Sequence, residues 1–191
     1  TNTFTSGKDN AVTIVTNGSV VGIDNIVTGS TTAFIDGSAN IVDNSELMKV
    51  IGGGNIVTNT TYSMVKGKNN KDYNGSNNTI LGETHDISNS SYVFMSGYDH
   101  TVLSDQYSGA IGKENSLTSN KTSFVIGEKN VAQDNESVLI TGENNDVSGN
   151  TKISLISGAT NKEKSGYANL TSGEINNINN EKMTITTGWK N

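Results

Sequence analysis

Hydrophobic and polar positions follow one another along this chain in a pattern that repeats every 15 residues. Glycine marks the register, because it recurs at every fifteenth position from Gly7 to Gly142 and, after one step of 16, continues at Gly158. Two residues before each glycine the side chain is usually aliphatic. Three residues after the glycine comes an asparagine or histidine, and two residues later a second, mostly aliphatic position. A fixed period of this kind predicts one structural unit per repeat.

Each repeat is too short for a helix pair, a propeller blade or a leucine-rich unit, which need about 20 to 50 residues. Two short strands and two turns do fit. The composition agrees, since β-branched residues precede each glycine while Asn, Ser, Asp and Gly fill the intervals. Identical positions at a constant period stack in register, so we predict an all-β parallel β-roll (a β-solenoid) of about 13 coils of 15 residues. Nothing divides the chain, and we expect a single domain over residues 1–191.

The glycine and the residue three positions later are expected to form the turns. Glycine adopts positive φ without a steric penalty, and an asparagine side chain can bond turn backbone or stack on its neighbours as an amide ladder. Histidine takes the asparagine's place in two coils, and Asn191 ends the column. The structural turn residues are Gly22, Gly37, Gly52, Gly67, Gly82, Gly97, Gly112, Gly127, Gly142, Asn25, Asn40, Asn55, His85, His100, Asn115 and Asn130.

Three coils depart from the pattern. The extra residue between Gly142 and Gly158 is expected in the turn over residues 146–152, where Gly149 can absorb it. Two other coils carry Asp72 and Glu163 at the second aliphatic position. An unpaired carboxylate in an apolar stack costs several kcal/mol. We therefore expect local irregularities in which each carboxylate turns outward or pairs with the adjacent Lys71 or Lys164.

Composition and charge exclude several classes of protein. The formal charge of −6 argues against a nucleic-acid partner, which would select a basic face. The chain has no cysteine, and therefore neither disulfides nor a thiolate nucleophile. No apolar run approaches the roughly 20 residues of a membrane span. Nothing at Thr1 resembles a signal peptide, so we expect a cytosolic protein or an excised mature segment.

The candidate chemistry is sparse. The two histidines, His85 and His100, occupy the asparagine column on consecutive coils, about 4.8 Å apart along such a stack. One interpretation is a two-histidine metal site with Asp86 or Asp99, and the favoured one is histidine replacing asparagine in the turn. Packed in that way, the pair should lose stability as the pH falls through about 6. No catalytic or phosphate-binding motif is present, so we expect no enzyme, cofactor or metal.

Two stretches carry a resemblance to a known family. Residues 108–115 (SGAIGKEN) and 123–130 (SFVIGEKN) resemble the S-V-A-I-G-x-x-[SN] repeat of YadA-like heads of trimeric autotransporter adhesins from Gram-negative bacteria. The glycine spacing extends the resemblance to nearly the whole chain. It implies a left-handed parallel β-roll with three chains side by side, carried on a coiled-coil stalk above an outer-membrane anchor. The chain would then be an excised head, displayed at the bacterial cell surface outside the outer membrane.

A YadA-like head implies an adhesin that binds host extracellular matrix (collagen, fibronectin or laminin) or a host receptor such as a carcinoembryonic-antigen-related adhesion molecule. The alternative is an ice-binding or purely structural solenoid, for which the best threonine column (Thr1, Thr16, Thr31 and Thr61) is interrupted by Glu46. Tyrosines and charged turns are the natural anchors of an adhesive surface. The candidate receptor-binding residues are Lys71, Asp72, Tyr73, Tyr98, Tyr107, Glu163 and Tyr167.

A second set of large apolar residues predicts assembly. Three residues before the glycine a large side chain recurs on every second coil, and in the coils between it lies one residue before the glycine, as in Val21 and Ile51. Both positions point away from the uniform aliphatic column, although a one-residue slip would exchange the two faces. Because both faces call for burial, we predict an obligate parallel homotrimer. Its interface residues are Phe4, Phe34, Met64, Phe94, Phe124, Leu139 and Leu155.

Overall fold

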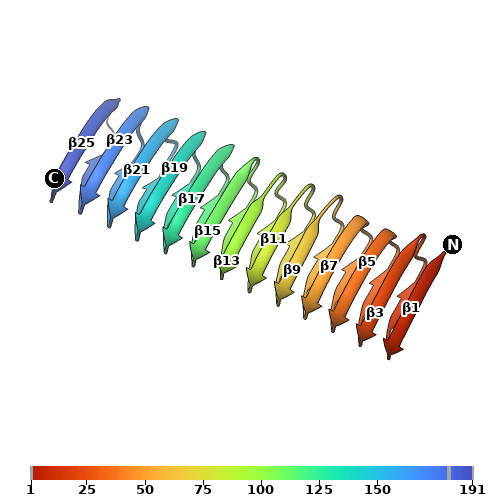
Figure 1. Cartoon of the computed structure of the whole chain (residues 1–191). Coiled ribbons are helices and arrows are strands. Elements are labelled where there is room, and N and C mark those ends of the chain that lie inside the picture. Colours follow the sequence, from red (N-terminus) through yellow and green to blue (C-terminus); the bar gives the residue numbers. More distant parts are fainter. Residues whose placement is uncertain (1, 180–181, 191) are drawn as a thin grey trace. The chain divides into compact units, whose positions relative to one another are not determined.

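The computed structural model describes residues 2–179 and 182–190, which form an all-β parallel β-solenoid of about 12 turns of about 15 residues (Figure 1). No helix occurs in these ranges. The predicted fold class is thereby confirmed, whereas the left-handed sense and the trimer stay predictions. Thr1 and Asn191, which the sequence places at the ends of the threonine and asparagine columns, lie outside the described residues.

The chain divides into two compact units, residues 1–95 and 96–191, and each coil contributes one long and one short strand. In the first unit the long strands pair in the order β1-β3-β5-β7-β9-β11 and the short strands in the order β2-β4-β6-β8-β10-β12. The long strands are β1 (Thr3–Lys8), β3 (Gly18–Ile23), β5 (Thr31–Ser38), β7 (Glu46–Gly53), β9 (Met64–Lys68) and β11 (Thr79–Glu83). The short strands are β2 (Ala11–Thr13), β4 (Ile26–Thr28), β6 (Ile41–Asp43), β8 (Ile56–Thr58), β10 (Lys71–Tyr73) and β12 (Asp86–Ser88).

Strand β13 (Phe94–Tyr98) begins in the first unit and ends in the second. In the second unit the long strands pair in the order β15-β17-β19-β21-β23-β25 and the short strands in the order β14-β16-β18-β20-β22-β24. The long strands are β15 (Ser108–Lys113), β17 (Thr122–Glu128), β19 (Ser137–Glu143), β21 (Ile153–Ala159), β23 (Ala168–Glu174) and β25 (Met183–Trp189). The short strands are β14 (Thr101–Leu103), β16 (Ser116–Thr118), β18 (Val131–Gln133), β20 (Asp146–Ser148), β22 (Lys162–Lys164) and β24 (Asn177–Asn179).

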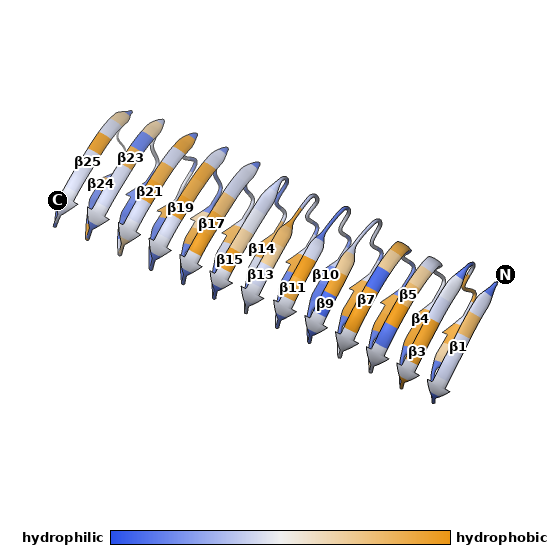
Figure 2. Ribbon diagram, viewed as in Figure 1, coloured by the Kyte–Doolittle hydropathy of each residue, from blue (hydrophilic) through white to orange (hydrophobic). Residues whose placement is uncertain are grey.

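The uniform aliphatic column points inward in both units, which decides the face assignment that the sequence left open. Successive strand residues point to opposite faces, so the staggered large side chains lie on the outer face of the long strands. Figure 2 shows hydrophobic segments recurring in successive long strands of the second unit. The fully buried residues two before the glycine are Val20, Ile35, Val50, Val65, Ile80, Met95, Ala110, Val125, Ile140 and Ile156.

Each glycine and its following asparagine form one interlocked corner. Gly22 has φ +126°, and a Cβ placed on it would lie 1.7 Å from the carbonyl oxygen of Gly37. The Asn25 amide donates to this same oxygen over 2.9 Å. In the next coil Asn40 donates both its backbone N–H (3.1 Å) and its side-chain amide (2.9 Å) to Asn25 Oδ1. In each repeat the glycine leaves room for a carbonyl oxygen of the next coil, and the asparagine three residues later donates a hydrogen bond to that oxygen.

The extra residue of the long step lies at the turn predicted for it. Asp146–Ser148 pairs with the preceding short strand at a spacing of 15 residues and with the following one at 16. Gly149 and Asn150 both have positive φ, +84° and +64°. A tight turn of two left-handed residues therefore absorbs the insertion and leaves the strand register intact.

Candidate functional site

The outer face of the long strands in the second unit carries a continuous apolar row. Its members, all three residues before the glycine, pair directly from strand to strand. The first four are each 38–40% exposed and the last is 77% exposed, so every coil of the row presents part of a large side chain to the surface. A contiguous apolar surface of this kind marks an interaction site. We call it the apolar row, and it consists of Phe124, Leu139, Leu155, Leu170 and Ile185.

In the first unit the same face is mixed. Phe4, Phe34 and Phe94 are exposed and Met64 is half-buried, while the coils between them carry polar residues such as Lys49 at this position. The Lys49 ammonium lies 5.8 Å from the centre of the Phe34 ring, within cation–π range. All seven predicted interface residues therefore lie on the outer surface of their coils. Whether a second copy covers them stays a prediction.

Two exposed tyrosines lie two coils apart along one edge of the first unit. Tyr62 and Tyr92 are both exposed, and Asn77 holds the same position in the coil between them. All three have left-handed backbone, with φ of +54°, +57° and +56° respectively. Their backbone N–H groups donate to carbonyl oxygens of the preceding coil over 2.9 Å. Asn17, Thr32 and Leu47 share this conformation at the same repeat position, so it belongs to the turn. What makes this edge a candidate for function is the pair of exposed aromatic rings on it. We call Leu47, Tyr62, Asn77 and Tyr92 the tyrosine edge.

Uncharged polar side chains accompany the tyrosine edge. Asn59 donates to Asn74 Oδ1 (3.2 Å) and Asn74 to Asn89 Oδ1 (3.1 Å), forming an exposed amide ladder three residues before each edge position. The hydroxyls of Ser76 and Ser91 bond over 3.0 Å. At one end, Leu47 lines an open, mostly apolar groove of about 490 Å³ together with Phe34 and Met48. The edge thus offers aromatic faces beside aligned hydrogen-bonding groups, as protein-binding surfaces often do.

The predicted receptor-binding residues do not converge on one site. Tyr98, Tyr107 and Tyr167 are exposed but occupy three different positions of the repeat. On β10 Lys71 is exposed and Tyr73 half-buried. Tyr62 and Tyr92, which the sequence analysis missed, share the repeat position of Tyr107, ten residues after the glycine. Grouping exposed aromatics by repeat position would have identified them.

The prediction that Asp72 and Glu163 turn outward or pair with lysine is wrong. Their exposed fractions are 0% and 1%, and both keep the regular strand register, Asp72 opposite Val57 and Glu163 opposite Val147. Neither makes an ion pair among the described residues, because the adjacent lysines point outward from the short strands. Buried polar side chains hold the carboxyls instead. A side chain this deeply buried cannot serve as a surface anchor.

Both histidines occupy asparagine positions in the turn. His85 Nε2 lies 3.2 Å from the Leu81 carbonyl oxygen and His100 Nε2 lies 3.2 Å from that of Ser96. His100 Nδ1 accepts the backbone N–H of Asn115 over 3.1 Å. A nitrogen facing a carbonyl must donate and one facing an N–H must accept, so His100 is the neutral Nε2–H tautomer. The ring reproduces the acceptor function of the asparagine amide, and its donor faces the carbonyl oxygen four residues earlier, as the Asn115 amide also does over 3.1 Å.

Acidification is expected to destabilise the coil of His100. Burial lowers the pKa of this ring below its usual value, so its stabilising contribution is complete above about pH 6.5 and is lost as the pH falls through the lower folded-state value. His100→Asn, which restores the usual residue of the column, should reduce the drop in melting temperature between pH 7.5 and pH 5. An unchanged drop in this variant would contradict the assignment.

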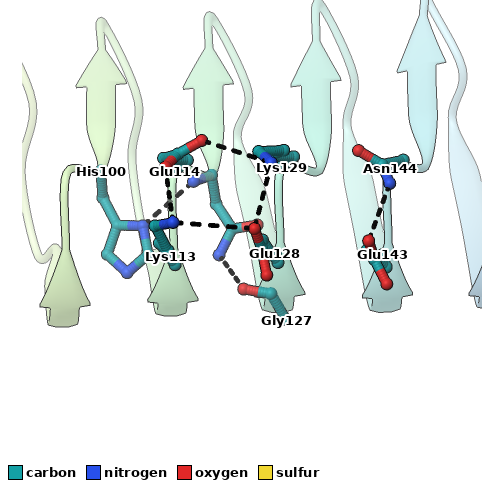
Figure 3. A network of polar contacts seen from close by, with 9 residues as sticks. His100, Lys113, Glu114, Gly127, Glu128, Lys129, Glu143 and Asn144 are labelled. Carbon is teal, nitrogen blue, oxygen red and sulfur yellow. Dashed lines mark hydrogen bonds and ion pairs between the residues drawn. The ribbon is translucent and has the colours of Figure 1, made fainter.

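A ring of four charges lies at the corner of the second unit (Figure 3). Lys113 contacts Glu114 (3.0 Å) and Glu128 (3.8 Å), and Lys129 contacts Glu128 (3.1 Å) and Glu114 (3.9 Å). The hydrogen bond from Lys113 lowers the pKa of Glu114. All four side chains are open to solvent, which screens such pairs. The two lysines and two glutamates neutralise one another at this corner.

No cluster of three or more metal-binding side chains occurs within residues 2–179 and 182–190. Those same ranges contain no helix with the length and apolar character that crossing a membrane demands. No protein-family model matches the chain, and no curated protein matches its sequence. The resemblance to YadA-like heads therefore stays a prediction from the motifs in residues 108–130 and from the glycine spacing.

Proposed function

We propose that this chain is the head of a bacterial surface adhesin of the YadA-like kind, and that it binds a host protein through the tyrosine edge. The exposed Tyr62 and Tyr92 in left-handed backbone are the observation that carries this proposal. Tyrosine supplies a large contact area at low entropic cost. The backbone N–H groups of both tyrosines are bonded to the preceding coil, which fixes the backbone that carries the rings. The partner is extracellular matrix or a receptor such as a carcinoembryonic-antigen-related adhesion molecule.

Assembly as a parallel homotrimer is the second part of the proposal. The apolar row would lie between chains, where each copy covers the large side chains of the next. This placement leaves the tyrosine edge, which belongs to a different part of the repeat, for the receptor. The proposed location is the bacterial cell surface, outside the outer membrane.

Replacing both edge tyrosines by asparagine should weaken receptor binding by at least tenfold, because buried tyrosine anchors typically contribute 2 kcal/mol or more, a factor of about 30. Asparagine already occupies this position at residue 77 with the same backbone conformation, so the turn should persist. Binding to immobilised collagen, fibronectin, laminin and a carcinoembryonic-antigen-related receptor ectodomain would be measured for the wild type and for Tyr62→Asn/Tyr92→Asn.

The matched control is Tyr167→Asn, an equally exposed tyrosine at a different repeat position. It should bind as the wild type does. Equal binding by the double variant and the wild type would contradict the assignment of the site. Thermal hysteresis without binding to any member of the panel would favour the ice-binding alternative.

A further inference from the structure

Two buried polar clusters in the solenoid interior share one sequence spacing. The first consists of Ser63, Asp72, Gly75 and Asn78, and the second of Ser154, Glu163, Gly166 and Asn169. In both, the acid follows the serine by nine residues, the glycine follows the acid by three, and the asparagine follows the glycine by three. We call these clusters the interior quartets. The acid of each replaces an aliphatic residue of the inward column.

In the first quartet the Asn78 amide donates to Asp72 Oδ1 over 3.0 Å. Burial raises the pKa of this carboxyl, and the side chains of Asn78 and then Ser63 lower it. A Cβ on Gly75 would lie 2.5 Å from Asp72 Oδ1 and 2.3 Å from Asn78 Nδ2. Glycine at this point is therefore what admits the two polar side chains. The second carboxyl oxygen, Oδ2, is buried without a hydrogen-bond partner.

The second quartet repeats this geometry. Glu163 Oε1 accepts hydrogen bonds from the Ser154 hydroxyl (2.6 Å) and from the Asn169 amide. A Cβ on Gly166 would lie 2.0 Å from Asn169 Nδ2. Again the other oxygen, Oε2, is buried without a partner. Two occurrences with the same spacing, a carboxyl in the inward column and an orphaned carboxyl oxygen indicate a built site.

The charged groups around Asp72 do not compensate a carboxylate. On its own strand, β10, the flanking Lys71 and Tyr73 point outward. On β12 Asp86 is half-buried with its side chain on the outer face, and on β8 the residue opposite Asp72 is Val57. His85, buried in the next coil, faces the Leu81 carbonyl. An isolated buried charge with an unbonded oxygen is costly, and a carboxyl in this position takes up a proton instead.

The first quartet also lies directly beneath the tyrosine edge. Ser63 and Asn78 each follow an edge residue, Tyr62 and Asn77. Ser63 Oγ accepts the Asn78 backbone N–H (3.4 Å), and Asn78 Oδ1 accepts the N–H of Val93, the residue after Tyr92 (3.1 Å). Ser63 and Asn78, which lie at the Asp72 carboxyl, thus also accept hydrogen bonds from the backbone beside the edge residues.

We propose that Asp72 and its quartet form an interior proton-binding site that couples pH to the order of the tyrosine edge. With the proton bound, the carboxyl, Ser63 and Asn78 form a neutral network that holds the edge backbone. Loss of the proton leaves a buried charge, which loosens Asn78 and the Val93 amide. The Glu163 quartet is a second proton-binding site, and no residue of the tyrosine edge belongs to its coils. The coupling to receptor binding rests on the proposed function, whereas proton binding and backbone order do not.

Burial supports this direction for both acids. It raises the pKa of Asp72 to about 6 and also raises the pKa of Glu163. Because the pKa of Asp72 is raised in the folded state, its stabilising contribution is complete below pH 3.8, the ordinary pKa of the carboxyl. This contribution is lost as the pH rises through about 6. The unfolding equilibrium constant changes about tenfold for each pH unit between the unfolded-state and folded-state pKa values. Asp72 alone should therefore raise this constant about a hundredfold between pH 4 and pH 8. The direction is opposite to that of His100.

The test uses the whole chain with ¹³C-labelled carboxyl groups. The Asp72 carboxyl should titrate near pH 6, and hydrogen exchange, corrected for the intrinsic rate, should show stronger protection of the Asn78 and Val93 amides at pH 5 than at pH 8. In Asp72→Asn this pH dependence of protection should disappear. Asp86→Asn, a neutralised acid on the next coil with its side chain outside, should retain it. Asp72→Val, which restores the column residue, replaces the asparagine variant if that one does not fold.

Titration of Asp72 near its ordinary value would overturn the proposal. So would equal protection of the two amides at pH 5 and pH 8 in the wild type, or a pH dependence that persists in the Asp72 variants. No receptor enters these measurements, so adhesion through Tyr62 and Tyr92 can fail while the proton site stands, and the reverse also holds.

Discussion

Gly52→Ala is expected to lower the free energy of unfolding by about 4 kcal/mol or more. Gly52 has φ +122°, a conformation that residues with a Cβ rarely adopt, and the new Cβ would lie 1.9 Å from the carbonyl oxygen of Gly67. That oxygen also accepts the Asn55 amide over 3.1 Å. The substitution therefore separates two coils and breaks a bond of the amide ladder. Urea unfolding followed by circular dichroism measures the loss.

The adjacent glycine provides the control. A Cβ on Gly53 would meet only ordinary contacts, at 3.4 and 3.5 Å from Ser38, and Gly53 does not have positive φ. Gly53→Ala should change stability by less than about 1 kcal/mol, because it mainly restricts the unfolded chain. If the two variants lost equal stability, the close approach between coils would not be the reason for the glycine period.

Leu155→Asp should convert the assembled protein into single chains. Leu155 lies in the middle of the apolar row, in register with Leu139 and Leu170. In a trimer the substitution places three unpaired carboxylates in an apolar interface, at a cost of several kcal/mol each. The side chain points away from the coil interior, so any loss of strand structure should follow dissociation and not precede it. Light scattering during size-exclusion chromatography measures the mass, and circular dichroism the fold.

Leu103→Asp makes the same change at a matched exposure, 37% against 40% for Leu155, on the outer face of the short strands. It should leave the mass of the assembly unchanged. Dissociation by Leu103→Asp but not by Leu155→Asp would place the interface on the other sheet. Unfolding of both variants without a change of mass would contradict an interface role for the row.

The glycine and asparagine columns, and with them the fold, could be predicted from the sequence because each follows from one local requirement repeated at every coil. The carbonyl oxygen of Gly37 occupies the place of a Cβ on Gly22 and accepts the amide of Asn25. Only glycine meets the first condition, and a short amide meets the second. The outward position of Phe34 and Leu155 could not be separated from an inward one, since a slip of one residue exchanges the faces.

The depth of Asp72 and Glu163 could not be predicted from their neighbours in sequence. The lysines beside them suggested a charged surface, yet residues adjacent on a strand point to opposite faces. The actual partners of Asp72 lie nine residues before it and six after it, on two different coils. The signal was present in the shared spacing of the two quartets, which a search for single irregular residues overlooks. The same holds for Tyr62 and Tyr92, whose common repeat position matters more than their surroundings.

The mass of the intact chain in solution tests the central claim most directly, because the adhesin proposal requires three copies joined along the apolar row. Sedimentation equilibrium across a range of micromolar concentrations should give about three times the 20.1 kDa of one chain, with no population of folded monomer. A stable, folded species of 20.1 kDa at every concentration would contradict the account.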